Sequence, residues 1–414
     1  MLKYWLAALC CVAAASASGL ASADQWDARA DAIVASFTVE QLVGQMNQVA
    51  ISSLLETTTN SLNETKVRQF AKAKVGSYLT SPFTRGLRNG ERGWTAQHWR
   101  DIMTRIQEIT MEENGGHPMI YGIDAAHGSG FVSNTVIFPH QLNAGAAFNT
   151  TQVYEMGRIT GRDTEAAGIP WVFGPMLEIA QNPLWARNYE SYGEDPYLVS
   201  VMADAIVRGL QSNKNTAACM KHFIGYSKLP SGHDKDGVTL SDFDLLNYFA
   251  PPFISAIKAG VLSGMENYIS INGVPTMANT RIMNDLLRND MGFQGMMVTD
   301  YGEINSLFGF HRVASTPAKA VELAVSRTSI DMSMVGAGMT FIDYAKPFLA
   351  KEPWRLQRIR ESVKRVIKLK LQVGLYDNPV PGADNVKLVG NADDVAHALE
   401  AARDSIVLLK NQDN

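Results

Sequence analysis

Short apolar runs alternate along the chain with longer segments whose apolar residues recur at helical spacing. The runs have the length of strands and are bounded by turn-forming residues, whereas the longer segments have the periodicity of amphipathic helices. The predicted strands are residues 75–79, 119–123, 171–173, 217–220, 260–265, 296–299 and 330–334. The clearest predicted helices are residues 95–113, 151–167, 241–259 and 355–372.

This alternation predicts an α/β fold with a parallel sheet, because parallel strands need a helical crossover between them. About seven or eight such units over about 350 residues fit a closed (β/α)₈ TIM barrel with insertions, which we place at residues 24–375. A doubly wound open sheet is the alternative. It is disfavoured because an open sheet concentrates its polar site at one switch point, whereas several predicted strands here end in polar residues.

Charged residues follow three of the predicted strands at the point where each ends. Asp124, the pair Lys221–His222 and Asp300 each come directly after an apolar run. Since the carboxyl ends of parallel strands share one face, these side chains are expected to line a common pocket. Asp300 has a structural alternative as a helix N-cap, because Glu303 stands three residues later as in a capping box.

The end of the chain has a different organisation. Residues 376–392 are rich in Pro and turn formers and are interpreted as a linker. A helix at residues 393–403 and an apolar strand at 405–409 are predicted to follow. Because one strand has no sheet to join, residues 393–414 are expected to be the start of a truncated C-terminal α/β domain, an incomplete α/β sandwich.

The first residues have the pattern of a secretory signal peptide at residues 1–23. Lys3 precedes an apolar run at 5–15, and small residues at 21–23 suit the cleavage positions. The run is too short to indicate a membrane anchor. The mature chain is therefore expected to begin at Asp24 and to be secreted and extracellular.

Two further features bear on secretion. Cys10 and Cys11 would leave with the signal peptide, so that only Cys219 remains and no internal disulfide is expected. A cysteine inside an apolar strand is more often a packing residue than a nucleophile. Asn63 and Asn149 begin Asn-X-Thr triplets and are candidate glycosylation sites in a eukaryotic host.

Composition and charge narrow the class of protein. The 414 residues are 46% hydrophobic and 19% charged, which suits a globular chain with a large core. The net charge of −4 gives no support for a nucleic-acid partner. The sequence has no zinc-type Cys/His spacing and no Gly-rich phosphate loop. We therefore expect neither a metal nor a nucleotide cofactor, and the sequence does not indicate an oligomeric state.

Several motifs together resemble those of the family 3 glycoside hydrolases, and in particular of their secreted β-glucosidases. The resemblance extends from about residue 24 to the end of the chain. Each motif is weak singly, but their shared order is specific. The matching segments are 121–128 (YGIDAAHG), 183–196 (PLWARNYESYGEDP), 221–223 (KHF), 265–274 (MENYISINGV), 292–301 (GFQGMMVTDY) and 401–411 (AARDSIVLLKN).

The resemblance implies a retaining glycosidase. In such enzymes one carboxylate attacks the anomeric carbon, and a second carboxyl group about 5 Å away protonates the leaving oxygen. Asp300 matches the nucleophile of the family, and Lys221 and Arg187 are expected to keep it ionised. The resemblance also implies that Asp124, Arg187, Lys221 and His222 bind hydroxyls of the terminal sugar, to which charged groups make strong hydrogen bonds.

The resemblance further implies that Met265, Tyr268 and Tyr301 form the pocket wall. Tyr301 stands where many relatives carry Trp; both rings can stack on a sugar, but Tyr is smaller. Met265 and Tyr268 have a structural alternative as packing residues. No role is assigned to Glu266.

Arg187 and His222 also have structural alternatives. Arg187 is alternatively a loop residue that pairs with Glu190 or Asp195. His222 is alternatively a satisfied core histidine beside Cys219.

The acid/base is the main departure from the family pattern. In two-domain relatives it is a Glu of the second domain, which is expected to have barely begun at Asn414. Single-domain relatives that act on N-acetylglucosaminides use a His in the loop after the Lys-His strand, with a Pro-Gly-His-Gly pattern. Here that loop contains His233 and Asp234 without this pattern, so we interpret His233 as an ordinary loop residue.

Three hypotheses about function remain at this stage. The first is an exo-acting β-glucosidase that hydrolyses terminal non-reducing glucose from β-glucosides or cello-oligosaccharides, with this chain a fragment of it. The second is a barrel that binds sugar with little turnover, because a missing general acid removes a rate factor of about 10² to 10⁴. A single-domain β-N-acetylhexosaminidase-like enzyme is a third possibility.

Overall fold

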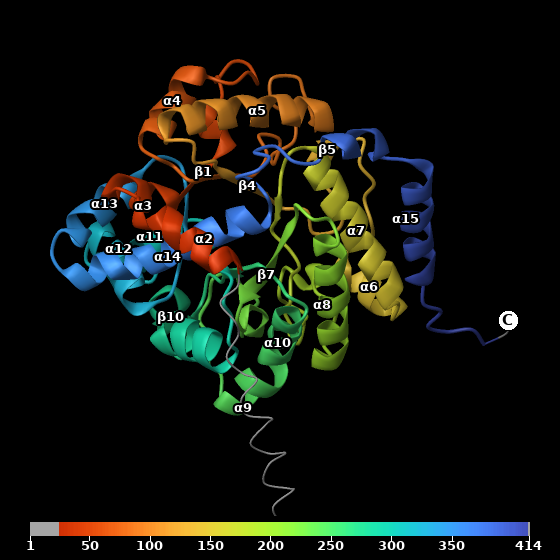
Figure 1. The fold of residues 1–414 in the computed structure, drawn as a ribbon. Coiled ribbons are helices and arrows are strands. Elements are labelled where there is room, and N and C mark those ends of the chain that lie inside the picture. Colours follow the sequence, from red (N-terminus) through yellow and green to blue (C-terminus); the bar gives the residue numbers. More distant parts are fainter. Residues whose placement is uncertain (1–24, 413–414) are drawn as a thin grey trace, which may run out of the picture.

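A computed structural model describes residues 25–412 and consists of a parallel barrel surrounded by helices (Figure 1). All strand pairs of the barrel are parallel, in the order β11-β8-β7-β6-β4-β2-β1-β12. A parallel bridge between Val298 and Met332 joins β11 to the segment before β12 and closes the ring. The strands are β1 (Asn47–Ala50), β2 (Ser77–Leu79), β4 (Ile120–Ile123), β6 (Trp171–Val172), β7 (Ala217–Phe223), β8 (Ser263–Glu266), β11 (Met296–Val298) and β12 (Ser333–Gly336).

Helices cover the outside of the barrel and follow the strands in sequence (Figure 1). Two of the segments, η4 and η6, are wound as π-helix. The helices are α2 (Gln25–Ala35), α3 (Val39–Gln45), α4 (Glu64–Lys72), α5 (Ala96–Glu113), α6 (Gln141–Ala147), α7 (Thr150–Ala166), α8 (Pro196–Gln211), α9 (Asp242–Asp244), η4 (Leu245–Phe249), α10 (Ala250–Lys258), η6 (Arg281–Asp290), α11 (Glu303–Gly309), α12 (Pro317–Arg327), α13 (Thr340–Leu349), α14 (Pro353–Gln372) and α15 (Ala392–Asp404).

Short elements lie in the connections. β3 and β5 form a parallel pair, and β9 and β10 form an antiparallel hairpin. Their bounds are β3 (Trp94–Thr95), β5 (Val132–Ser133), β9 (Ser270–Ile271), β10 (Val274–Pro275), η1 (Ile51–Leu54), η2 (Asn188–Glu190), η3 (Tyr226–Lys228), η5 (Thr276–Ala278) and η7 (Ala383–Leu388).

The predicted (β/α)₈ barrel is confirmed, with one strand that the apolar pattern did not reveal. β1 begins with two polar residues, Asn47 and Gln48, which are fully buried. Gln48 donates a hydrogen bond to Ser77 Oγ on the neighbouring strand β2, at 2.8 Å. Because β1 begins with polar residues whose partner is distant in sequence, the apolar pattern does not indicate this strand.

Alternate side chains along the strands point into the barrel and fill its interior. The same alternation decides which residues at the strand ends face inward. Ala217 and Cys219 of β7, and Met296 and Val298 of β11, belong to the interior cluster. Successive side chains of a strand point to opposite faces, so the residues two positions after Cys219 and Val298 also face inward. These two residues are Lys221 on β7 and Asp300 just after β11. Cys219 is free and buried, as its predicted packing role requires.

The segment after the barrel differs from the prediction at one element. The helix predicted at 393–403 is observed as α15, but the strand predicted at 405–409 is wrong, because these residues have no strand structure. Ile406 and Leu409 are largely exposed. An extended segment becomes a strand only when its backbone groups pair with a neighbour, and no described strand lies beside it.

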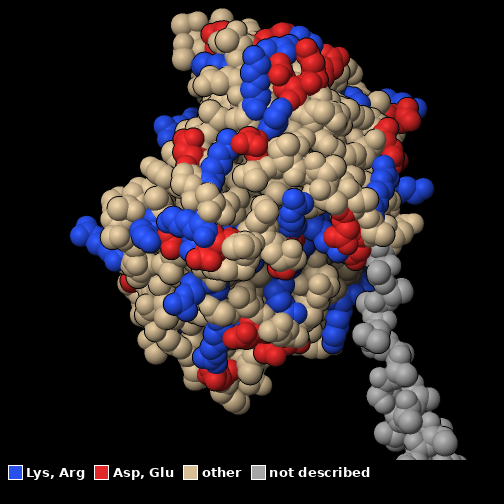
Figure 2. Space-filling view, turned by 60° about the vertical axis from the view of Figure 1, so that its left-hand side comes forward, with Lys and Arg blue, Asp and Glu red and all other residues tan. Residues whose placement is uncertain are grey.

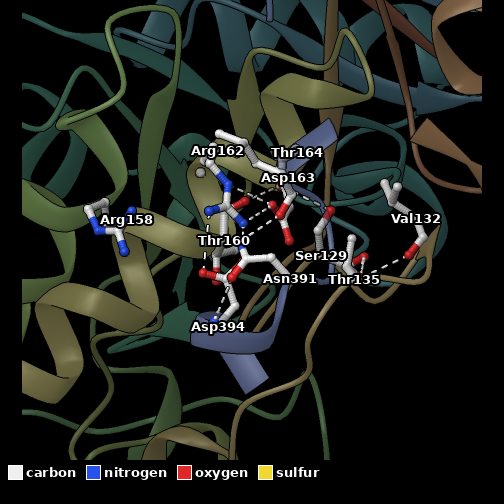
Figure 3. A network of polar contacts seen from close by, with 12 residues as sticks. Ser129, Val132, Thr135, Arg158, Thr160, Arg162, Asp163, Thr164, Asn391 and Asp394 are labelled. Atoms are coloured by element: carbon white, nitrogen blue, oxygen red, sulfur yellow. Dashed lines mark hydrogen bonds and ion pairs between the residues drawn. The ribbon is translucent and has the colours of Figure 1, made fainter. Parts of the chain in front are cut away.

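A buried ionic cluster attaches α15 to the outside of α7, where Figures 1 and 3 show the two helices in contact. Arg162 of α7 donates to Asp163 Oδ1 at 2.5 Å and 2.9 Å and pairs closely with Asp394 of α15. Asn391, the N-cap of α15, donates to Asp394 Oδ2 at 2.7 Å. The residues predicted to follow the linker are thus held against the barrel by charge-assisted hydrogen bonds.

Surface charges of both signs are interspersed on the face shown in Figure 2. Some of them pair between neighbouring helices, as Arg105 of α5 does with Glu64 of α4 at 2.7 Å. Exposed pairs of this kind stabilise a fold only slightly. The predicted signal peptide, residues 1–23, and the start at Asp24 lie outside the described residues. Within residues 25–412, no helix has both the length and the apolar character required to span a bilayer.

Candidate active site

One cavity of about 340 Å³ opens at the carboxyl ends of the barrel strands and brings together all eight predicted site residues. They come from the ends of β4, β7, β8 and β11 and from the loop after β6. The prediction that these side chains line a common pocket is thereby confirmed. The lining residues are Leu79, Thr80, Asp124, Ala126, Phe173, Arg187, Glu190, Lys221, His222, Met265, Tyr268, Asp300, Tyr301 and Met334.

Asp300 lies at the floor of the cavity, two residues after β11. Its Oδ1 accepts a hydrogen bond from the Tyr301 N–H at 2.6 Å, the Tyr268 hydroxyl also interacts with the carboxylate, and Oδ2 is buried. The N-cap alternative is wrong, because the N-cap of α11 is Gly302. The Asp300 carboxylate is therefore held among hydrogen-bond donors of the cavity.

The charge state of Asp300 is set by opposing effects. Burial raises the pKa of Asp300 to about 6, while the Tyr268 hydroxyl, the Tyr301 N–H, Lys221 and Arg187 lower it. The two predicted cations thus favour the carboxylate, but removal from water outweighs them. Asp300 is mainly ionised at neutral pH and becomes protonated under mildly acidic conditions.

Asp124 and Lys221 form an ion pair across the cavity, with Lys221 Nζ at 2.8 Å from Asp124 Oδ1. The Lys221 side chain is buried, whereas that of Asp124 is 53% exposed. Burial disfavours the ammonium, but Asp124 outweighs this and raises the pKa of Lys221 above its ordinary value. Lys221 therefore stays charged, and Asp124 retains lone pairs that face solvent and can accept hydrogen bonds from hydroxyl groups.

Arg187 forms the ion pair with Glu190 that was predicted as its structural alternative, and it also lines the cavity. It makes a two-pronged ion pair with Glu190, at 2.7 Å and 3.0 Å, and its Nη1 also lies 3.4 Å from His222 Nε2. Asp195 does not share this pair but instead caps α8. The ion pair with Glu190 holds the guanidinium in place at the cavity wall, with Nη1 directed toward His222 and away from Glu190.

His222 is oriented by a buried acid that the sequence analysis did not single out. Glu178 Oε1 accepts from the His222 backbone N–H and contacts its ring Nδ1, each at 2.7 Å. Burial lowers the pKa of His222 well below its usual range, so the ring is neutral. The other ring nitrogen, Nε2, lies 3.5 Å from Asp300 Oδ2.

Glu178 itself is fully buried, and burial raises its pKa to about 8. A sequence signal was present, because the run after β6 continues through Met176 and Leu177 directly into Glu178. This run has the same form as those that end at Asp124 and Asp300. The strand predicted at 171–173 ends before this run, so Glu178 does not stand at a predicted strand end.

The cavity wall is aromatic on one side. Lys235 Nζ lies 3.8 Å from the centre of the Tyr268 ring, and Met265 is buried at the end of β8. Tyr301 is 49% exposed and its ring packs on Gly336 of β12, where a Cβ atom would lie 2.3 Å from the ring. Because Gly336 also has φ of +81°, only glycine combines this backbone with this contact.

Comparison with known proteins connects this geometry to a family. Residues 38–369 match the model of the glycosyl hydrolase family 3 N terminal domain. The chain belongs to glycosyl hydrolase family 3. The family predicted from the motifs is thereby confirmed.

Individual members of family 3 resemble the chain over much of its length. The chain is 36% identical to a lysosomal beta glucosidase of Dictyostelium discoideum, over 94% of this chain and 49% of that protein. It is 28% identical to a periplasmic beta-glucosidase of Salmonella typhimurium, over 71% of this chain and 39% of that protein. The chain therefore spans about half, or less, of these relatives' length.

A solved structure supports the same fold. The crystal structure of an exo-1,3/1,4-beta-glucanase from a Pseudoalteromonas species superposes with a TM-score of 0.84 at 27% identity, and covers 96% of this chain and 49% of that one. The barrel found here is thus the barrel of a family 3 glycosidase. Within residues 25–412, no cluster of three or more His, Cys, Asp or Glu residues is arranged to hold a metal ion.

Proposed function

We propose that this chain takes part in the hydrolysis of terminal, non-reducing β-D-glucosyl residues, with Asp300 as the nucleophile of a retaining mechanism. The observation that carries the proposal is that Asp300 lines one cavity together with charged and polar side chains that are suited to bind hydroxyls. The relatives named as beta glucosidases and the exo-acting glucanase support this substrate class and an exo mode of action.

In the proposed first step, Asp300 Oδ2 attacks the anomeric carbon as the bond to the leaving oxygen breaks. The carboxylate becomes an ester in a glycosyl-enzyme intermediate, and the leaving oxygen takes up a proton. Water then attacks the anomeric carbon and loses a proton, which balances the proton taken up by the leaving oxygen; glucose is released and the Asp300 carboxylate is regenerated. Since only the ionised form attacks, this step should slow as the pH falls below about 6.

Four side chains are proposed to bind the sugar before the attack. Asp124 accepts from two neighbouring hydroxyls, and Lys221 and Arg187 donate to hydroxyl oxygens. His222 is proposed to bind a further hydroxyl through Nε2, the ring nitrogen that does not contact Glu178. Tyr301, Tyr268 and Met265 are proposed to contact the apolar face of the sugar.

The proton donor for the leaving group is not assigned to a described residue. Of the other carboxylates that line the cavity, Asp124 is paired with Lys221 and Glu190 with Arg187. His233 is exposed and is not among the lining residues, which argues against the hexosaminidase-like alternative. The described residues by themselves favour sugar binding with slow turnover of substrates whose leaving group needs protonation.

The substrate class is tested with aryl β-glycosides whose leaving group needs little protonation. We expect faster release of the phenol from the β-glucoside than from the β-xyloside or the N-acetyl-β-glucosaminide. The xyloside lacks the C6 hydroxymethyl group, and the N-acetyl group needs additional space at C2. Equal or faster reaction of either analogue would contradict the proposed specificity for glucose.

We also propose that the protein is exported and that the mature chain begins near Asp24. The lysosomal and periplasmic locations in the names of the relatives support an exported protein. N-terminal sequencing of the native product tests this, and an intact Met1 in the cytosol would contradict it. The candidate glycosylation residues, Asn63 and Asn149, are both partly exposed N-caps, of α4 and α7. Their modification remains a prediction.

We propose the domain boundaries on the same basis. Residues 24–375 form the barrel domain, 376–392 the linker and 393–414 the beginning of a further segment, in which α15 packs on α7. Limited proteolysis should cut within the linker sooner than within the barrel. Preferential cleavage inside the barrel would contradict these boundaries.

A further inference from the structure

A second pair of acids lies behind Asp300, away from the residues that face the cavity. Glu266, the last residue of β8, is fully buried, and its Oε1 accepts a hydrogen bond from the Asp300 backbone N–H at 3.3 Å. Glu303, in the first turn of α11, is also buried. Neither residue lines the cavity. Glu266 thus connects β8 directly to the backbone of the proposed nucleophile.

Each of these acids has one oxygen with nothing to bind. Glu266 Oε2 and Glu303 Oε1 have no hydrogen-bond partner among the described residues. Two ionised carboxylates in one buried site repel each other, and unsatisfied buried oxygens are costly. A proton on Glu266 would remove one negative charge from this buried site.

The surroundings of the two acids differ. Glu303 is at the N-terminus of α11, which favours a negative charge, and its Oε2 lies 3.5 Å from His311 Nε2. Two negatively charged side chains, Glu303 and Asp300, act on Glu266. Lys235 is the cation that acts on it, and its ammonium lies over the Tyr268 ring. Burial, followed by the charges of Glu303 and Asp300, raises the pKa of Glu266 well above its ordinary value.

We propose that Glu266 is a positioning residue for Asp300 that stays protonated at neutral pH in a buried site that also contains Glu303. The proposal rests on the proposed function, because it takes Asp300 as the nucleophile. The neutral carboxyl keeps its acceptor oxygen on the Asp300 N–H without placing a second charge beside the attacking carboxylate. Loss of the proton at alkaline pH places that charge there and disturbs the position of Asp300.

The test is the pH dependence of covalent labelling by an activated aryl 2-fluoro-β-glucoside, which needs little acid catalysis. The wild type should show an acidic limb from Asp300 and an alkaline limb from Glu266. Glu266→Gln, whose amide mimics the neutral acid, should keep the acidic limb in place and lose the alkaline limb. Glu303→Gln should shift the alkaline limb to lower pH, because the Glu303 charge is what helps to raise the pKa of Glu266.

Glu165→Gln is the matched control. Glu165 is also a buried acid with a pKa raised by burial, to about 6, but it lies on α7 and does not line the cavity. Its replacement should leave both limbs unchanged. Cooperative thermal unfolding and an adduct on Asp300 confirm that each variant is folded and labelled at the same carboxylate.

The outcomes separate this proposal from the proposed function. If Glu266 is ionised at neutral pH, Glu266→Gln removes a negative charge beside Asp300 and shifts the acidic limb to lower pH, which overturns the proposal. An alkaline limb unchanged in both Glu variants also overturns it, and Glu303→Gln alone decides this point if Glu266→Gln does not fold. Labelling of a carboxylate other than Asp300 in the wild type would instead refute the proposed function.

Discussion

The replacement Tyr268→Phe tests how the cavity sets the charge of Asp300. The Tyr268 hydroxyl lowers the pKa of Asp300, which burial raises to about 6. A hydrogen bond to a charged group contributes about 1.5–3 kcal/mol, and one pKa unit corresponds to about 1.4 kcal/mol, so its loss corresponds to about one to two pH units. Water that enters the vacated space should solvate the carboxylate and reduce the effect. We therefore expect the pKa to rise by about one unit, to about 7.

The assay is the rate of labelling by an activated 2-fluoro-β-glucoside, measured from about pH 4 to about pH 9. The midpoint of the acidic limb should move up in Tyr268→Phe, while the rate on the plateau changes less. Tyr78→Phe is the control, because the Tyr78 hydroxyl is buried without a partner among the described residues and lies outside the cavity lining. An acidic limb that stays in place or moves to lower pH in Tyr268→Phe would refute the reasoning.

Three further replacements give predictions for stability and for the cavity wall. Asp300→Asn should be more stable than the wild type by up to about 3 kcal/mol above pH 6, and the gain should vanish near pH 4. The reason is that the native state holds this proton up to about pH 6 and the unfolded chain only to about 3.8, so wild-type stability falls as the pH rises between these values; urea unfolding at both pH values measures the difference. Arg162→Met leaves Asp163 and Asp394 buried without their cation and should cost about 3–5 kcal/mol in urea unfolding, whereas a loss below about 1 kcal/mol would contradict a buried ionic cluster. Gly336→Ala should displace the Tyr301 ring and weaken the binding of aryl glucosides, and unchanged affinity would show that the ring position does not matter.

The barrel was predictable because parallel strands buried on both faces form apolar runs, and seven of the eight strands have this pattern. β1 does not, since buried Asn47 and Gln48 depend on partners far along the chain. The strand predicted at 405–409 shows the opposite error: an apolar run is necessary for a buried strand, but a partner strand is also needed.

The site was predictable where charged residues stand at strand ends, because the barrel brings these ends to one face. The acids behind them were not. Glu178 follows an apolar run, but Glu266 and Glu303 look like ordinary polar residues in the sequence, and the importance of all three comes from burial near His222 or Asp300. Burial of an acid depends on what tertiary structure packs around it, which no local pattern records.

The most direct measurement is the identification of the carboxylate that an activated 2-fluoro-β-glucoside labels. A sample whose circular dichroism shows cooperative thermal unfolding is incubated with the reagent, digested and analysed by mass spectrometry. The account predicts one added sugar on the peptide that contains Asp300, and no adduct in Asp300→Asn. A label on Asp124, Glu190 or another carboxylate of the folded wild type, or an adduct that persists in Asp300→Asn, would contradict the assignment of Asp300 as the nucleophile.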